Sequence, residues 1–431
     1  MRLSLRRAWF WMTWLGLISA LGGVSALAAP SDVQLEEMAA HRAFLFFWNE
    51  SNPVTGLTKD RARNLGRPDA NTVASVAATG YALASLPIAA QRYWITQDAA
   101  YRRALRTLRF VAQRLPQDHG FFYHFVDWRT GTRVWQCELS SIDSALLVLG
   151  ALADGQYWPR TEVALLAEAL YERMDFGWML TDGGDLPQSL TLSMGWKPET
   201  GWLGTRWAGY SEASFLYLLA LGSPTHPIAP RCWATWDTPL TRVEGHPVFG
   251  GPTPLFMAQM ASGYFDLGGM RDGQGRDWWA NFRNAHLANH AYCARNPQHR
   301  KTYSGAIWGI TACDQPPPVG YGAQVPADGR NDGTVAPTAA VGAIVFAPEL
   351  ARASLHALYP EYRGRIWGRY GFSNAFNADK NWYDRDVIGI DLGMMLLALE
   401  NARSGLVWRL MRRVPGVKRG LAAAGFHRAQ A

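Results

Sequence analysis

Residues 71–80 read NTVASVAATG, a stretch of small and β-branched residues without a charge. Helix axes approach more closely where the side chains at the contact are small. The stretch therefore predicts a helix, at 72–91, that is packed tightly against other helices.

Helical periodicity continues on both sides of this stretch, interrupted by Gly- and Pro-rich loops that hold most of the Trp residues. Together with 72–91, we expect helices at 33–49, 98–115, 140–156, 161–174, 211–221, 254–265, 278–296, 336–346, 348–358 and 391–403. No low-complexity linker divides the chain, so residues 29–431 are predicted to form one domain with very little strand. The pattern favours an all-α (α/α)6 toroid, an inner ring of helices within an outer ring; an open solenoid of helical hairpins is the alternative.

The first 28 residues have the pattern of a bacterial export signal. Arg2, Arg6 and Arg7 precede an apolar stretch at 8–24, and small residues follow at 26–28. We expect a cleaved signal peptide and a periplasmic or secreted protein, with an uncleaved membrane anchor as the alternative.

The charge balance excludes a polyanion binder such as a nucleic-acid-binding protein. Without residues 1–28 the chain has 39 basic and 35 acidic residues, a net charge of only +4. Basic residues gather near the end, at Arg409, Arg412, Arg413, Lys418, Arg419 and Arg428. They indicate a C-terminal helical tail with a solvated face, or one in weak contact with an anionic membrane surface.

Four cysteines follow the signal, at Cys137, Cys232, Cys293 and Cys313. An exported protein can form disulfides, and Cys293 and Cys313 are the pair we expect to bridge.

The 20 Trp residues and an aromatic content of 13% suggest a carbohydrate ligand. Aromatic rings stack on the apolar faces of sugars while their polar atoms stay hydrogen-bonded. We expect several Trp residues of the loops to line a sugar cleft, namely Trp135, Trp196, Trp202, Trp207, Trp308 and Trp382. The alternative is that the rings fill a helical core.

Glu212 is the first candidate catalytic residue. GYSEA at 209–213 resembles a serine-hydrolase elbow, but no strand pattern precedes Ser211, as that motif requires. Two interpretations remain for an acid at the start of an apolar helix: helix capping, or a carboxyl group directed into a cleft. In the second case desolvation would raise the pKa of Glu212.

A second acidic group is Glu138 and Asp143, on either side of a predicted helix start with Ser140 or Ser141 as its cap. Upstream, GFFYHFVDWRTG predicts a short hairpin in which Tyr123, His124 and Asp127 face a cleft or form a surface turn.

Asp391 lies between Gly389 and Gly393 within an apolar run. Glycines there would keep the backbone bare where another group approaches closely. A helix start also favours the ionised form of an acid, so a low pKa is expected for Asp391. Asp384 and Asp386 are alternative working acids, and Asp332, in a turn, is a weaker candidate.

His286, His290 and Cys293 have the spacing of metal ligands on one helix face. No further ligand pattern completes a zinc signature, so we expect two hydrogen-bonded histidines, no metal and no cofactor.

Several blocks together resemble the bacterial glycoamylase-like family, which includes glycoside hydrolase family 144. They are YHFVD (123–127), CELSSIDSALL (137–147), LSMGWKPETGWL (192–203), GYSEASFLYLLALGSPTHP (209–227), DGTVAP (332–337) and RSGLVWRLMRR (403–413). The resemblance spans residues 40–425. It implies an (α/α)6 toroid and inverting hydrolysis of β-1,2-glucans.

The resemblance makes Glu212 the expected general acid and Asp391 the expected general base. Leu392 departs from the pattern, because Gln is expected there. The substrate-binding residues expected are Glu138, Asp143, Tyr123, His124, Tyr210, Trp196, Trp207, Trp308 and Trp382.

The sequence thus predicts a monomeric glycoside hydrolase acting on a poly- or oligosaccharide. A non-catalytic glucan-binding protein, which Leu392 favours, and a polysaccharide lyase are the alternatives.

Overall fold

The computed structural model describes residues 30–326 and 331–429. The chain divides into Met1–Ser31 and Asp32–Ala431, and the elements below all belong to the second unit. The signal peptide predicted at residues 1–28 lies outside the described residues. None of the helices in the described part of the chain has the length and hydropathy needed to span a membrane.

One set of helices is buried on all sides. In α2 (Val76–Gln91) every residue but the last is buried, and in α7 (Ser214–Leu221) every residue is. The same set includes α4 (Ser141–Tyr157), α9 (Phe256–Tyr264), α11 (Pro337–Gly342) and α13 (Gly389–Ser404). A helix that is apolar all round belongs inside a larger core, so we call this set the inner helices.

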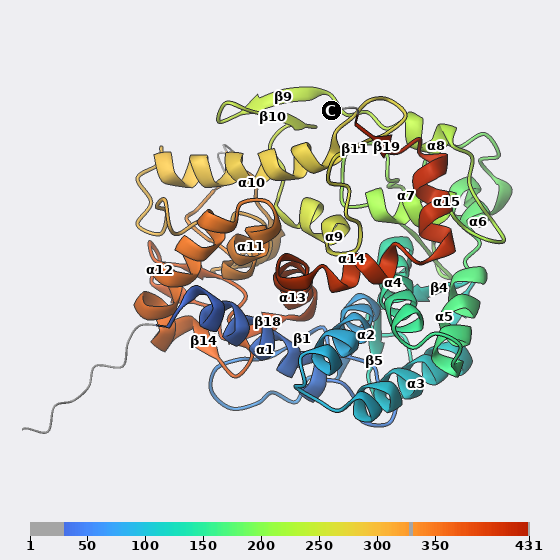
Figure 1. The fold of residues 1–431 in the computed structure, drawn as a ribbon, viewed down its shortest axis with the longest axis horizontal. Helices are drawn as coiled ribbons and strands as arrows, with labels where there is room; N and C mark the ends of the chain where they lie inside the picture. Colours follow the sequence, from blue (N-terminus) through green and yellow to red (C-terminus); the bar gives the residue numbers. More distant parts are fainter. Residues whose placement is uncertain (1–29, 327–330, 430–431) are drawn as a thin grey trace, which may run out of the picture. The chain divides into compact units, whose positions relative to one another are not determined.

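Contacts among the inner helices run in a circuit: α2 with α4, α4 with α7, α7 with α9, α9 with α13, and α13 back to α2. Figure 1 shows α13, seen nearly end-on, in the middle of α1, α2, α9 and α11. A Cβ atom added at Gly150 of α4 would overlap the carbonyl oxygen of Gly80 in α2. The tight packing predicted from residues 71–80 is therefore confirmed.

A second set of helices packs outside the first. It consists of α1 (Asp32–Asn49), α3 (Gln97–Gln113), α5 (Glu162–Glu172), α10 (Trp278–Arg295), α12 (Pro348–Ile366) and α15 (Pro415–Ala423). These contact α13, α2, α4, α9, α11 and α7, respectively. They are amphipathic: α3, for example, buries only Ala100, Ala104, Thr107, Leu108 and Val111.

Shorter helices complete the helical part: α6 (Phe176–Thr181), α8 (Arg231–Ala234), α14 (Leu406–Met411), and the 3-10 turns η1 (Asp182–Gly184) and η2 (Ala343–Val345). In the C-terminal tail, the basic side chains at 409, 412, 413, 418, 419 and 428 are exposed. The buried face of α15 packs on α7. The basic side chains are therefore accessible, as both interpretations of the tail require.

Short strands, two to four residues long, are more numerous than expected. They are β1 (Arg61–Arg63), β2 (Val73–Ser75), β3 (Gln117–Asp118), β4 (Phe121–Tyr123), β5 (Phe125–Asp127), β6 (Leu139–Ser140), β7 (Gly195–Lys197), β8 (Gly201–Trp202), β9 (Leu240–Val243), β10 (His246–Phe249), β11 (Met270–Arg271), β12 (Ala312–Gln315), β13 (Gly320–Ala323), β14 (Trp367–Gly368), β15 (Gly371–Phe372), β16 (Phe376–Asn377), β17 (Trp382–Tyr383), β18 (Asp386–Ile388) and β19 (His427–Arg428).

Two sheet pairings bear on the site. β3, β4, β6, β7 and β8 form a five-stranded sheet in that order, and β1 pairs with β18, immediately before α13. The hairpin predicted within 120–131 does not form between β4 and β5, because β4 pairs with β3 and β6, whereas β5 pairs with β2. A turn follows β5 instead, closed by the bridge between Val126 and Arg133.

The cysteine prediction is also wrong. All four cysteines are buried free thiols, so Cys293 and Cys313 do not form a disulfide.

Candidate active site

The starts of the inner helices carry the candidate acids. Asp143 lies in the first turn of α4, Asp391 in the first turn of α13, and Glu212 two residues before α7. The charge of Asp143 acts on both Glu212 and Asp60, and that of Asp60 acts on Asp391. Acids from distant parts of the sequence therefore share one electrostatic neighbourhood.

Glu212 lies in a turn, not in a helix. The expected helix at 211–221 begins only at Ser214, and the Ser211 hydroxyl accepts a 3.4 Å hydrogen bond from the amide of Ala213. Capping of α7 therefore does not explain the acid. Burial, with a smaller contribution from the charge of Asp143, raises the pKa of Glu212 to about 7, as its place at the edge of an apolar helix predicted. Such a group is suited to donate a proton near neutral pH.

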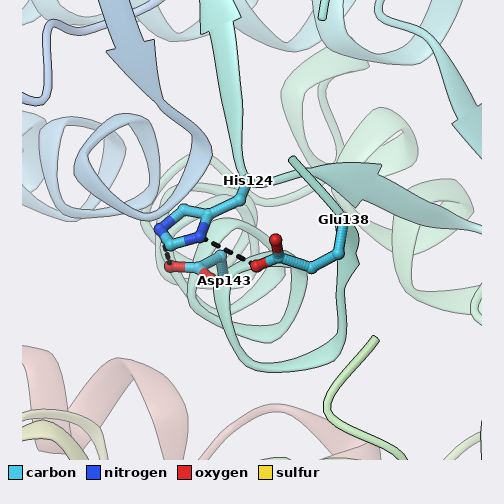
Figure 2. Close-up of side chains that lie close together, drawn as sticks. All are labelled: His124, Glu138 and Asp143. Carbon is cyan, nitrogen blue, oxygen red and sulfur yellow. Dashed lines mark hydrogen bonds and ion pairs between the residues drawn. The ribbon is translucent and has the colours of Figure 1, made fainter. Parts of the chain in front are cut away.

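His124 lies between two carboxylates, as Figure 2 shows. Its Nδ1 is 3.0 Å from Oε1 of Glu138, and its Nε2 is 3.5 Å from Oδ1 of Asp143. Burial opposes the charging of the imidazole, but the two carboxylates outweigh it and raise the pKa of His124 to about 9. His124, whose side chain is 30% exposed, is therefore a half-buried imidazole paired with two carboxylates, which favour its protonated form.

These three side chains, His124, Glu138 and Asp143, could also hold a metal ion, since their ligand atoms lie within 4.8 Å of one another. A metal requires a neutral imidazole. The raised pKa of His124 instead favours the protonated ring, so the cluster is satisfied as an ion-pair network.

The position of Asp143 is fixed by the start of α4. Ser140 caps the helix by accepting a 3.2 Å hydrogen bond from the amide of Asp143, and its hydroxyl donates to Oδ2 of the same residue. The predicted cap is confirmed, and it directs the carboxylate toward His124.

Asp391 is buried, with 4% of its surface exposed. The side-chain amide of Asn374 donates a 2.5 Å hydrogen bond to its Oδ2. Burial nevertheless raises the pKa of Asp391 to about 8, and the charges of Asp314 and Asp60 add to the effect. The prediction that the helix start keeps this pKa low is wrong, because desolvation exceeds the contribution of the helix dipole.

The glycines around Asp391 serve packing. A Cβ atom at Gly389 would lie 2.9 Å from the Cβ of Ala78, and one at Gly393 would overlap the ring of Tyr81. Leu392, the position where Gln was expected, is 1% exposed and belongs to the hydrophobic core. The amide beside Asp391 is supplied instead by Asn374.

Sequence reasoning missed three charged groups here. Arg61 donates to Asp314 at 2.9 Å and to Asp60 at 3.2 Å, and both acids act on Asp391. Each lies in a polar stretch without a recognisable motif, TKDRAR or TACDQ. Arg61 is brought to the strand before α13 by the pairing of β1 with β18, and the sequence carries no signal for that pairing.

The alternative acids differ in their surroundings. Asp384 is buried, and burial together with the charge of Asp314 raises its pKa to about 7. Asp386 forms a 3.1 Å ion pair with Arg63. Asp332 accepts a 2.8 Å bond from Lys380, which helps to hold its pKa low against burial. The ion pair with Lys380 therefore accounts for the presence of an acid at position 332 without a catalytic role.

Tyr210 and Tyr123 are both half-buried. The ring of Tyr210 packs against Trp278, and the charge of Glu212 acts on its hydroxyl. The ring of Tyr123, in β4, is covered by the guanidinium of Arg133 at 4.7 Å. Tyr210 thus lies beside the candidate acid Glu212. One face of the Tyr123 ring is covered by Arg133, so only the other face could stack on a sugar.

Two of the predicted Trp residues are core residues. Trp308 is fully buried, and Trp207 is 7% exposed and donates its indole N–H to Ser141 at 2.9 Å. Neither offers a face to a sugar, so this prediction is wrong for both. Burial depends on which side of a loop faces the helices, and composition does not show that.

The remaining predicted Trp residues are accessible. Trp196, Trp202 and Trp382 are half-buried, and Trp135 is 69% exposed. Trp196 stands opposite both Leu139, the neighbour of Glu138, and Trp202 in the five-stranded sheet. Because successive side chains of a strand point to opposite faces, Trp196 and Trp202 lie on the face of the sheet away from Glu138, where Trp178, which was not predicted, packs against Trp202 with ring centroids 4.4 Å apart.

The histidine prediction is confirmed for His286. It is fully buried, contacts the carbonyl of Phe282 at 2.7 Å and the amide of Gln259 at 3.1 Å, and has a pKa lowered by burial to about 4. His290 lies 2.9 Å from the carbonyl of Gly305. Both are held by protein partners.

Known proteins resemble this chain over most of its length. The family described as Putative glucoamylase matches residues 204–415. An exo-β-1,2-glucooligosaccharide sophorohydrolase (non-reducing end) of Parabacteroides distasonis is 25% identical over 92% of this chain. The chain spans only 59% of the length of that relative.

Two solved structures cover nearly the whole chain. An endo-β-1,2-glucanase from Chitinophaga pinensis, in complex with sophorotriose and glucose, is 26% identical with a TM-score of 0.86, over 93% of this chain and 99% of its own. A protein described as a putative glucoamylase from Bacteroides caccae is 29% identical with a TM-score of 0.86, over 93% of this chain and 100% of its own.

Proposed function

We propose that this chain, which matches the family described as Putative glucoamylase over residues 204–415, is a glycoside hydrolase that cleaves a β-1,2-linked glucan. The observation that carries the proposal is the raised pKa of Glu212 within a cluster of acids at the starts of the inner helices. The glucanase and sophorohydrolase relatives support the choice of substrate. The circuit of contacts among inner helices, covered by outer ones, supports the (α/α)6 toroid expected of the family.

In the proposed reaction, Glu212 donates its proton to the glycosidic oxygen as the bond to the anomeric carbon breaks. Because the pKa of Asp391, about 8, lies above that of Glu212, about 7, the reaction proceeds from the fraction of molecules in which Asp391 is ionised and Glu212 is protonated. In that fraction, Asp391 removes a proton from a water molecule whose oxygen bonds to that carbon from the opposite face. The products are two saccharides, and the configuration is inverted. An inverting enzyme of this kind places its two carboxyl groups roughly 6.5 to 9.5 Å apart.

Export is a separate part of the proposal. The basic start, apolar stretch and small residues within 1–28 favour a periplasmic or secreted enzyme. N-terminal sequencing of the mature protein tests this, and retention of residues 1–28 in the membrane fraction would support the anchor instead.

The main test is incubation with linear and cyclic β-1,2-glucan, with reducing ends and anomeric configuration followed by NMR before mutarotation. Release of inverted product is expected. Glu212→Gln should lower the rate by about 10²- to 10⁴-fold while glucan binding and the melting temperature stay close to those of the parent.

Each competing outcome has a distinct signature. Binding without product would support a glucan-binding protein, and unsaturated products would support a lyase. Full activity in Asp391→Asn would move the base role to Asp384, Asp386 or Asp143. Product of retained configuration would contradict the pairing of Glu212 with Asp391.

A further inference from the structure

Asn374 is the one side chain that joins Asp391 to the rest of the acidic cluster by hydrogen bonds within the described residues. It is 1% exposed and follows β15 in the segment between α12 and β16. Its own backbone amide donates a 2.8 Å hydrogen bond to the carbonyl of Asp386. The residue is thus held from its main chain as well as from its side chain.

The orientation of the Asn374 amide is determined by its partners. Its Oδ1 accepts a 2.8 Å hydrogen bond from the backbone N–H of Asp314, which can only donate. If the amide were flipped, its NH₂ group would face that N–H, donor against donor. The NH₂ group must therefore point to Oδ2 of Asp391, where the 2.5 Å bond is found.

The partner of Asn374 is itself anchored. Asp314 belongs to β12, and its carboxylate accepts a 2.9 Å bond from Arg61, which also donates to Asp60. Asn374 therefore connects the carboxyl group of Asp391 to a strand fixed by an ion pair. A donor in this position stabilises the ionised carboxylate and leaves Oδ1 of Asp391 for another ligand.

We propose that Asn374 is the positioning residue of the base: its amide keeps Asp391 able to ionise in a buried site and directs Oδ1 toward the attacking water. The inference rests on the proposed hydrolytic function. It also accounts for Leu392, because the amide beside Asp391 comes from a different segment of the chain.

Some of the groups around Asp391 raise its pKa and others lower it. Burial, Asp314 and Asp60 raise its pKa, whereas Asn374 and Arg61 lower it. The hydroxyl of Tyr81 and the thiol of Cys313 also lie near Asp391, and each has a pKa raised by burial and by nearby acids, so both are neutral over the working pH range. The charge of Asp391 also acts on the hydroxyl of Tyr321, a residue that is 49% exposed. Removing the Asn374 donor should therefore shift the balance further toward protonated Asp391.

The test compares Asn374→Leu with Asn377→Leu. Asn377 is also fully buried and donates to the carbonyl of Asp332 and the hydroxyl of Thr334, at 3.0 Å each, without a bond to Asp391. Both variants lose a buried amide, but only the first loses the donor to the base. If Asn374→Leu does not fold, Asn374→Ala replaces it, because the space left by the smaller side chain can hold water.

The expected readout is the limb of the pH profile of kcat/KM that reports ionisation of the base. In Asn374→Leu this limb should move up by at least about one pH unit, which lowers kcat/KM about tenfold on its acidic side and restores it at high pH. In Asn377→Leu, any change in kcat/KM should be the same at every pH, so that the limb does not move. An unmoved limb in folded Asn374→Leu and Asn374→Ala would overturn the inference.

A second readout does not need turnover. In protein carrying ¹³C-labelled aspartate carboxyls, the resonance missing from Asp391→Asn identifies Asp391, and its titration midpoint should rise in Asn374→Leu but not in Asn377→Leu. An equal midpoint in all three proteins would overturn the inference. Absence of glucan hydrolysis in the parent would reject the proposed function alone, and the titration would then decide the role of Asn374.

Discussion

Asp143 and Asp154 lie on the same helix, α4, about three turns apart, yet their surroundings are opposite. Asp143, in the first turn, is 8% exposed and is bonded to Ser140 and His124. Asp154, in the last turn, is fully buried, and neither of its carboxyl oxygens has a hydrogen-bond partner among the described residues. One acid is built into a network, and the other is isolated.

The difference shows that hydrogen-bond partners, as well as position on a helix, set the charge of a buried acid. The amino end of a helix favours a carboxylate, whereas the carboxyl end disfavours one. Burial raises the pKa of Asp154 well above its ordinary value. Near it, the hydroxyls of Tyr264 and Tyr81 are also buried without hydrogen-bond partners in the described part of the chain, their rings 6.0 Å apart. The end of α4 thus lies among neutral polar groups, whereas its first turn takes part in an ion pair with His124.

The largest expected difference between the two acids is in activity. Asp143→Asn should lower kcat/KM by about 10- to 100-fold, because a charge that acts on Glu212 and holds His124 is lost, and hydrogen bonds to charged groups are worth about 1.5 to 3 kcal/mol. Asp154→Asn should retain nearly full activity on β-1,2-glucan. Equal losses in the two variants would remove the functional distinction.

In the pH dependence of stability, by contrast, Asp154 should have the larger effect of the two acids. The pKa of Asp154 is raised in the folded state, so the folded protein holds a proton that the unfolded chain releases above about pH 4. The free energy of unfolding should therefore fall as pH rises from there toward the folded pKa, by at most about 1.4 kcal/mol per pH unit. Asp154→Asn should abolish this slope. Urea unfolding at pH 5, 6.5 and 8 measures it, and parallel curves for parent and variant would mean that Asp154 is ionised when buried.

His124 tests the network around Asp143 with the opposite sign of charge. Its pKa is about 9 in the folded state, above the unfolded value of about 6.5. The stabilisation is therefore complete below about pH 6.5 and is lost as pH rises through 9. His124→Gln should cost roughly 1 to 3 kcal/mol at pH 6 and much less at pH 9.5, after allowance for partial solvent screening. A cost independent of pH would show a neutral imidazole.

The smallest effect expected is that of the helix cap. Ser140→Ala removes the bond to the amide of Asp143 and the bond to its carboxylate, and loss of such a cap typically costs about 1 kcal/mol. Thermal unfolding checks the value. Ser354→Ala, at a buried serine of α12 whose hydroxyl has no hydrogen-bond partner among the described residues, is the control for a general loss of a hydroxyl.

Most helices of this fold were predictable because their patterns are long. Residues 33–49 and 278–296 coincide with α1 and α10 to within one residue at either end. The short strands were not predictable, since strands such as β2 and β6 have only two or three residues and are defined by partners distant in sequence. The start of α7 was missed for a similar reason: the turn at Glu212 depends on surrounding loops.

The site was predictable only where an acid stood out from its local sequence. Glu212 and Asp391 each lie at the edge of an apolar run, and Glu138 and Asp143 flank a capped helix start. Asp60 and Asn374 lie in loops and Asp314 in the short strand β12, all without a recognisable motif, so their importance emerges only from their interactions with Asp391. The charge of Asp391 was mispredicted because a helix start is visible in a sequence, whereas its degree of burial is not.

The position of α13 in the chain has a consequence for biosynthesis. This helix is the last of the inner helices in sequence order, and it contacts α1, α2, α9 and α11 while supplying Asp391. A protein is made from its N-terminus, so the ribosome has released nearly all of the other inner helices before residues 389–404 appear. Until then, the faces of α2 and α9 that α13 covers remain open to water, and intermediates with exposed apolar surface are prone to aggregate. The nascent chain therefore has a long interval in which a chaperone is useful, and hydrolytic activity reports that this last helix is in place.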